Sequence, residues 1–274
     1  MNGLHGVHLG FPTLLEFRGP DVVRFLNGQL TQDVRLLAGG EISLPSCVTD
    51  AKGKLQFRVT LTAATADTLW ITLPVDQATG LEARLTRYLI ADDVEVVERT
   101  GEFELYHWLG AVMQTPAGVI SRRSERYGVI GADWWVPAGQ EISAEKSFHT
   151  ADELETLRIT HGVPVWGREL HEGLLPPEAL LDQTDVSYHK GCYVGQEVIS
   201  RLKSAGKVNK RLTQFHFAAE IPVIPSLLEN GAGEITSVAP IAKDGLRAAL
   251  GYVKRSAGEL FFRGADGVLY PVKS

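Results

Sequence analysis

Alternating apolar and polar residues in the first half of the chain constrain its fold most strongly. Over residues 57–62 every second side chain is apolar, and residues 69–73 repeat the alternation, which predicts two antiparallel strands. Apolar residues recur at helical spacing over 75–90, and strands are indicated again over 92–98 and 103–109. Strands followed by a helix and by further strands favour an α+β layer, with helices on one face of a mostly antiparallel sheet.

Three other segments carry helix signals. Residues 22–28 follow a Gly-Pro-Asp turn and place their apolar side chains on one stripe, which predicts a short helix. Thr150 and Glu153 have the spacing of a capping box, so we expect a helix to begin there, with its leucines facing inward. A further helix is expected over 196–206.

The remaining segments are dominated by turn formers. Residues 110–144 predict short strands and loops, and Arg122, Arg123 and Arg126 in this region are expected to be surface charges. A strand is expected over 185–188. Beyond residue 206, short strands separated by Gly, Pro and Asp predict a small β-barrel or sandwich. These strands are expected at 214–217, 233–238, 248–253 and 269–272.

Composition excludes several classes of protein. Apolar residues make up 44% of the 274 residues and charged residues 22%, as in ordinary globular proteins. No apolar run approaches the roughly 18 residues that span a bilayer, so we expect a cytoplasmic protein without membrane contact. Cys47 and Cys192 are the only cysteines and form no C-x-x-C pair, which argues against a disulfide scaffold, a metal site or a cluster held by the chain's own thiolates.

The net charge of −6 argues against a sequence-independent nucleic-acid binder, but one stretch is locally basic. Residues 198–219 contain no acidic side chain. The cations of this stretch are Arg201, Lys203, Lys207, Lys210 and Arg211. These cations could simply form a solvated basic face. The alternative is a binding site for an anionic ligand or a weak contact with RNA through 201–211.

The segment Lys190–Glu197 is the strongest candidate for a functional site. It places Cys192 between two glycines and beside two basic residues, ahead of the helix expected from Gln196. A positive helix end and nearby cations both favour the thiolate form of a cysteine. The alternative is that Cys192 is a buried structural residue, because free cysteine packs readily as a small hydrophobic side chain.

Lys190–Glu197 resembles the K-G-C-Y-x-G-Q-E signature of the YgfZ-type folate-binding proteins. These are relatives of the glycine-cleavage T-protein and of mitochondrial proteins that mature iron–sulfur clusters. Residues 19–33 and 155–170 resemble further segments of that superfamily, and the G-E-I-T-S and A-L-G-Y-V pieces resemble its C-terminal barrel.

The resemblance implies an α+β fold with a T-protein-like folate-binding domain of two ferredoxin-like subdomains and a small C-terminal antiparallel β-barrel. The folate-binding domain is expected over 1–206 and the barrel over 207–274. Within the first domain, residues 1–45 with 146–206 are expected to form one subdomain and residues 46–145 the other.

The resemblance also implies that tetrahydrofolate or a one-carbon derivative of it binds in a central channel. Aromatic side chains would contact its rings, polar groups the pterin edge and cations its carboxylates. The expected folate-binding residues are Tyr88, Thr160, Trp166, Gly191, Tyr193, Gln196, Glu197, Arg201 and Arg211, and the residues expected to carry chemistry are Lys190 and Cys192. For the three aromatic residues the alternative is plain core packing, and for Arg201 it is an i,i+4 pair with Glu197.

Two departures from the superfamily pattern argue against classical aminomethyltransferase activity. The strand beginning near Gly53 has no carboxylate at the position where the aminomethyltransferase carries its aspartate. Thr160 stands where the family often has the glutamate that contacts the pterin edge. Whether the protein is an enzyme at all is left open by the sequence.

The resemblance therefore implies a tetrahydrofolate-binding protein that supports iron–sulfur cluster assembly or repair, with Cys192 as its functional locus. Its partners would be iron–sulfur client enzymes, such as those that modify tRNA, or assembly proteins. One alternative is a folate-dependent one-carbon transferase. A second alternative is a non-enzymatic adaptor for a client protein or tRNA.

Overall fold

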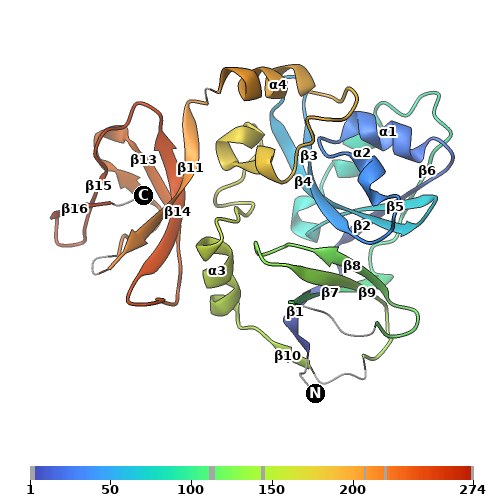
Figure 1. Cartoon of the computed structure of the whole chain (residues 1–274), viewed down its shortest axis with the longest axis horizontal. Coiled ribbons are helices and arrows are strands. Elements are labelled where there is room, and N and C mark those ends of the chain that lie inside the picture. Colours follow the sequence, from blue (N-terminus) through green and yellow to red (C-terminus); the bar gives the residue numbers. More distant parts are fainter. Residues whose placement is uncertain (1–3, 111–114, 143–145, 207, 219–220, 273–274) are drawn as a thin grey trace. The chain divides into compact units, whose positions relative to one another are not determined.

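The computed structural model describes residues 4–110, 115–142, 146–206, 208–218 and 221–272. The chain divides into two units, which are described separately (Figure 1). The first unit comprises Met1–Phe148 with Gln183–Val198, and the second comprises His149–Asp182 with Ile199–Ser274.

The first unit contains two five-stranded sheets. One has the order β3-β4-β5-β2-β6 and is antiparallel throughout, with strands at Ser43–Thr49, Leu55–Thr65, Thr68–Leu73, Thr13–Arg18 and Glu95–Glu98. The other has the order β10-β1-β7-β9-β8, with strands at Lys146–Phe148, Leu4–Gly10, Phe103–Leu109, Gly131–Pro137 and Ile120–Ser124. In the second sheet only the β1–β10 pair is parallel.

Two helices cover the β3-β4-β5-β2-β6 sheet (Figure 1). Helix α1 (Val22–Gln29) buries Val22, Phe25 and Leu26 in the core of this sheet, as its apolar stripe predicts. Helix α2 (Leu81–Thr86) is shorter than the expected helix over 75–90, because Gly80 adopts a left-handed φ of +84° and separates it from the 3₁₀ turn η2 (Val75–Gln77). A further 3₁₀ turn, η1, spans Val34–Leu37.

The second unit is built on a curled six-stranded antiparallel sheet, β11-β14-β13-β12-β15-β16 (Figure 1). Its strands lie at Lys210–Phe217, Arg247–Lys254, Gly233–Val238, Ser226–Leu228, Phe261–Arg263 and Leu269–Pro271. Helix α3 (Ala151–Thr160) begins at the predicted Thr150–Glu153 capping box. The 3₁₀ turns η3, η4 and η5 span Pro176–Ala179, Leu181–Gln183 and Glu229–Gly231, and helix α4 (Gln196–Ala205) continues the chain from the first unit into the second.

The α+β architecture predicted from the sequence is confirmed, and two local expectations are wrong. Residues 185–188 form no strand, because their polar groups pair with loop and side-chain partners instead of a neighbouring strand. Arg126 is not a free surface charge: its guanidinium donates from Nε and Nη2 to the buried Asp133 carboxylate at 2.8 Å each. Arg122 likewise donates to the Ala63 carbonyl at 2.6 and 2.9 Å, so it ties two sheets of the first unit together.

Candidate functional site

The segment that carries Cys192 is anchored to the loops around α1 and β3 within the first unit. The Val194 amide donates to the Gly28 carbonyl at 3.1 Å, and the Val194 carbonyl accepts from the Thr49 hydroxyl at 2.6 Å. Further back, the Ser187 amide donates to the Thr31 carbonyl at 2.9 Å. These bonds between residues far apart in the sequence hold the segment in place although it has no strand pairing of its own.

The side chain of Lys190 contributes two of the hydrogen bonds that hold this segment. Its side chain is buried, and its Nζ donates to the carbonyls of Leu30 at 2.7 Å and Gln32 at 2.6 Å. The same Nζ lies 5.2 Å from the centroid of the Tyr193 ring. Burial lowers the pKa of Lys190 to about 7, although the nearby Asp33 carboxylate opposes the shift. The geometry makes Lys190 a residue that positions the segment.

Lys190 gives a testable pH dependence. Its pKa is about 7 when folded and 10.5 as an ordinary lysine, so between these values the unfolded chain binds more protons than the folded one. The free energy of unfolding is therefore expected to rise with pH across this window, by up to about 1.4 kcal/mol per pH unit. Denaturant unfolding of the wild type and of Lys190→Met at several pH values tests this, because the rise should be absent from the variant. Parallel pH profiles would show that Lys190 does not titrate in this window.

The two cysteines have opposite environments. Cys192 is exposed, so the alternative of a buried structural residue does not hold for it. Cys47 is fully buried in β3, and burial raises the pKa of its thiol well above the usual range, with the Asp185 carboxylate adding to the rise. Three residues separate Cys192 from the first residue of α4, so its thiol is not in the first turn of that helix. The accessibility of the Cys192 thiol therefore comes from its exposure and not from a position at the end of a helix.

The two glycines beside Cys192 serve different purposes. Gly195 has a φ of +89°, and a Cβ there would lie 2.5 Å from the Asp50 carbonyl oxygen and 2.7 Å from Thr49 Oγ1. It therefore allows the segment to approach the β3–β4 turn closely. Gly191 is exposed, and a Cβ there would meet no atom within 4 Å. Packing therefore does not require a glycine at position 191.

Two arginines that the sequence did not single out hydrogen-bond to residues that hold this segment in place. Arg58 donates to the buried Asp185 carboxylate through Nε at 2.7 Å and Nη2 at 3.2 Å. Arg84 donates to the Thr49 carbonyl at 2.6 Å, and its guanidinium carbon lies 5.5 Å from the centroid of the Tyr88 ring. The expected folate residue Tyr88 is thus connected through Arg84 to the residue that binds Val194. Nothing in the spacing of these residues along the chain indicated the two contacts.

The structure divides the expected site residues between the two units. Lys190, Gly191, Cys192 and Tyr193 lie together in the first unit with Tyr88, and the Gln196 amide donates to the Tyr193 carbonyl at 3.1 Å. Glu197 is exposed in the first turn of α4, where a carboxylate suits the helix dipole. Thr160, Trp166, Arg201 and Arg211 belong to the second unit.

Within the second unit these residues have different surroundings. The Thr160 carbonyl accepts from the Gln214 side-chain amide at 2.8 Å, which joins the end of α3 to β11. Trp166 is partly buried in a turn that bridges to Leu170. Arg201 and Arg211 are both exposed residues.

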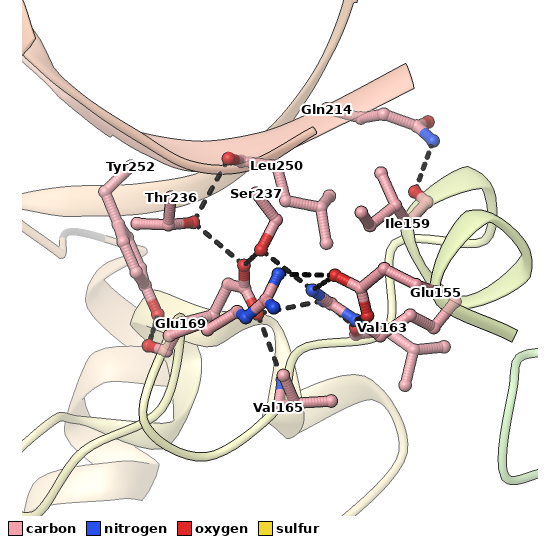
Figure 2. Close-up of polar contacts among 12 residues, drawn as sticks. Glu155, Ile159, Val163, Val165, Glu169, Gln214, Thr236, Ser237, Leu250 and Tyr252 are labelled. Atoms are coloured by element: carbon pink, nitrogen blue, oxygen red, sulfur yellow. Dashed lines mark hydrogen bonds and ion pairs between the residues drawn. The ribbon is translucent and has the colours of Figure 1, made fainter. Parts of the chain in front are cut away.

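A buried polar network, which the sequence did not reveal, fixes the turn that carries Trp166 (Figure 2). The fully buried Glu169 carboxylate accepts from Arg158 at 3.0 Å, from the Ser237 hydroxyl at 2.5 Å and from the Thr236 hydroxyl at 2.9 Å. Arg158 also pairs with Glu155 at 2.5 Å. The network connects α3 and the 163–170 turn to β13.

The described part of the chain sets limits on other kinds of site. No helix in it is both long and apolar enough to cross a membrane. Nor do three or more of its His, Cys, Asp or Glu side chains come together in a way that could hold a metal ion.

Comparison with known proteins places this geometry in context. A scan of family models finds no match. The iron–sulfur cluster assembly factor IBA57 homologue of Cryptococcus neoformans is 26% identical over 246 residues, which cover 75% of this chain and 64% of that protein. The human factor IBA57 is 26% identical, with 93% of this chain and 79% of that protein covered. An uncharacterized protein of Haemophilus influenzae is 28% identical over 72% of this chain and 68% of its own length.

Among solved structures, the glycine-cleavage aminomethyltransferase T of Bartonella henselae matches with a TM-score of 0.80. The match covers 98% of this chain and 84% of that chain, at 16% identity. The chain is similar in sequence to the IBA57 assembly factors and has the fold of aminomethyltransferase T. The resemblance inferred from the sequence is thereby confirmed. The chain spans slightly less than two thirds of the length of the Cryptococcus factor, so the activity of such a factor is carried over only as a proposal.

The cytoplasmic location expected from the sequence is wrong on this comparison. The assembly factors of Cryptococcus, Dictyostelium and human are all named mitochondrial. Composition and the absence of a long apolar run do not distinguish these two compartments, which is why the sequence argument failed.

Proposed function

We propose that this IBA57-related chain binds tetrahydrofolate or a one-carbon derivative and supports iron–sulfur cluster assembly or repair. The names of its relatives support the assembly role, and its fold supports the folate. The clients would be iron–sulfur enzymes, such as those that modify tRNA, or other assembly proteins.

One observation carries the proposal: an exposed thiol stands on a segment that is rigidly anchored. Cys192 is exposed, while Lys190, Val194 and Gly195 on either side of it are fixed by short bonds and close packing. A cysteine serving only the core would be buried, as Cys47 is. A held, accessible thiol is suited to binding iron or accepting sulfur from a partner, because thiolates are the ligands of iron–sulfur clusters.

The residues present are chemically suited to a folate. Tyr88 and Trp166 would contact its rings, Thr160 and Gln196 its pterin edge, and the exposed Arg201 and Arg211 its carboxylates. Further contacts are proposed for Gly191, Tyr193 and Glu197. When bound, a reduced folate supplies a carrier for one-carbon units. The protein's own part would be to bind and orient it.

Titration of the purified protein with tetrahydrofolate tests this part of the proposal. We expect saturable binding that weakens about tenfold or more in Arg211→Gln, because a charge-assisted bond to a carboxylate is lost. Lys243→Gln removes an exposed positive charge elsewhere in the second unit and should leave the affinity unchanged. Absence of saturable binding to the wild-type protein would refute the folate proposal.

The second candidate function is a folate-dependent aminomethyl transferase, which the fold match favours. Against it, the residues of strand β4 (Leu55–Thr65) include no carboxylate, and the nearby Asp50 carboxylate already accepts the amides of Lys52 and Lys54 at 2.9 and 2.8 Å. An aminomethyl-transfer assay distinguishes the two functions, and we expect no turnover. The adaptor alternative, with tRNA contact through 201–211, would instead be indicated by steeply salt-dependent tRNA binding.

A further inference from the structure

The second unit carries an open cavity of about 610 Å³ where β11 begins and β14 ends. Its lining residues are Glu178, Asn209, Lys210, Lys254, Arg255 and Ser256. Three positive charges against one negative charge leave the lining with a net charge of +2. None of these residues is among those proposed to contact folate or to carry the chemistry of Cys192, so the inference goes beyond the proposed function.

The pairing of β11 with β14 places the cations of the lining next to one another. Lys210 on β11 lies directly opposite Lys254 on β14, and the Arg255 amide donates to the Asn209 carbonyl at 2.9 Å, which extends the pairing by one step. Like charges directly opposite one another destabilise an antiparallel pair. The arrangement is therefore unfavourable unless an anion occupies the space between them.

The protein itself provides little to neutralise these cations. The carboxylate of Glu178 accepts the Leu175 amide at 3.3 Å, and it is the only acid in the lining. In the ranges that the structure describes, no acidic side chain forms an ion pair with Lys210, Lys254 or Arg255. Lys210 is held by an aromatic ring instead, since its Nζ lies 4.3 Å from the centroid of the buried Tyr252 ring.

The cavity does not coincide with the basic stretch seen in the sequence. Lys210 and Arg211 are consecutive strand residues, so their side chains point to opposite faces of the sheet. Of the stretch 201–211, only Asn209 and Lys210 line the cavity, and the other cations come from the far end of β14. The pocket is thus assembled by the fold and is separate from the arginine proposed to contact folate.

We propose that this cavity binds the phosphate group of a small phosphorylated ligand. A phosphate monoester carries a charge of about −1.5 to −2 at neutral pH, which matches the net charge of the lining. The ammonium groups would act as point charges and the Arg255 guanidinium as a two-pronged donor, while Ser256 and Asn209 add a hydroxyl and an amide. A single carboxylate, with one charge, would leave half of the net charge unmatched.

The size of the cavity indicates a ligand larger than phosphate alone. Pockets for small organic ligands typically measure about 300–1,000 Å³, and a volume of about 610 Å³ falls within that range. The phosphate would lie beside the cations, and the rest of a ligand the size of a mononucleotide would fill the remaining space.

Isothermal titration of the purified full chain with inorganic phosphate and with adenosine 5′-monophosphate tests the proposal. We expect both probes to bind to the wild type. Lys254→Gln and Arg255→Gln should each weaken binding about tenfold or more, because each removes a charge-assisted contact. Lys243→Gln removes an exposed charge on the same unit and serves as the matched control, with no change in affinity expected. Tighter binding of the nucleotide would identify a nucleotide site, and equal binding would identify a site for the phosphate group alone.

A second measurement guards against variants that fail to fold. Without ligand, Lys254→Gln should be at least as stable as the wild type, because it relieves the like-charge pair. At the same phosphate concentration, the unfolding temperature should rise less in Lys254→Gln than in the wild type and in Lys243→Gln. The proposal is overturned if neither probe binds the wild type, if the Lys254 and Arg255 variants bind as well as the wild type, or if a tri-γ-glutamate peptide or an RNA oligonucleotide binds this site more tightly than both probes.

Discussion

Replacing Arg158 by methionine is expected to lower the free energy of unfolding by about 3–5 kcal/mol, because the change leaves a buried carboxylate without its cation. Glu169 is fully buried, and Arg158 is its only charged partner among the described residues, at 3.0 Å. The Ser237 and Thr236 hydroxyls would still donate to the carboxylate, but neither carries a charge. Equilibrium unfolding in denaturant measures the effect.

Arg168→Met is the matched control for this prediction. Arg168 pairs with Glu155 in the same network at 2.6 Å, but 47% of its side chain is exposed. An exposed ion pair contributes about 0–1 kcal/mol, so the control should lose little stability. Similar losses in the two variants would mean that burial of Glu169 does not determine the stability of the network.

Gly195→Ala is expected to lower the free energy of unfolding by about 2–4 kcal/mol, through backbone strain and overpacking together. The φ of +89° disfavours any residue with a Cβ. The added methyl would also lie 2.5 Å from the Asp50 carbonyl oxygen, 2.7 Å from Thr49 Oγ1 and 2.9 Å from Gly53 Cα. Either the turn or the Cys192 segment has to move, and thermal or denaturant unfolding would register the loss.

The other glycine of the motif supplies the control. Gly191 does not have a left-handed φ, and a Cβ there meets no atom within 4 Å. Gly191→Ala should therefore change the stability by no more than about 0.5 kcal/mol. A large loss in Gly191→Ala, or none in Gly195→Ala, would contradict the packing described for this segment.

Much of the fold could be predicted where the local pattern agrees with the final packing. Strand β7 has the predicted bounds, and α3 begins at its capping box, because alternation and capping are visible in a single stretch of sequence. Strand β2 was not predicted. Its residues are buried with hardly any alternation, since Glu16 within it is buried by bonds from Trp70 at 3.0 Å and Arg99 at 3.1 Å.

Helix α3 shows the same limit in its inward face. The expected inward leucines, Leu154 and Leu157, are only partly buried, whereas Arg158 and Ile159 are buried. Arg158 can be buried because Glu169 and Ser237 compensate its charge, and Ser237 lies 79 positions away in the sequence. A partner at that distance cannot be read from helical periodicity.

The sequence indicated a candidate site, but it did not indicate the contacts that hold that segment in place. The Lys190–Glu197 motif, with its exposed Cys192, is where the pattern indicated a site. The supports of the segment were missed because their partners are distant, as with Arg58 and Asp185, which are 127 positions apart. The cation cluster of the second unit also arises from strand pairing, and the pairing partners could not be predicted from the sequence.

The most direct test of the central claim is a complementation experiment with cysteine variants. Cells lacking their own related assembly factor would express wild-type protein, Cys192→Ser or Cys47→Ala at matched levels, and the activity of an iron–sulfur enzyme would be measured under oxidative load. We expect Cys192→Ser to fall to the level of cells without the protein, while Cys47→Ala, which alters only a buried thiol, restores activity. Full activity with Cys192→Ser would contradict the assignment of Cys192 as the functional locus.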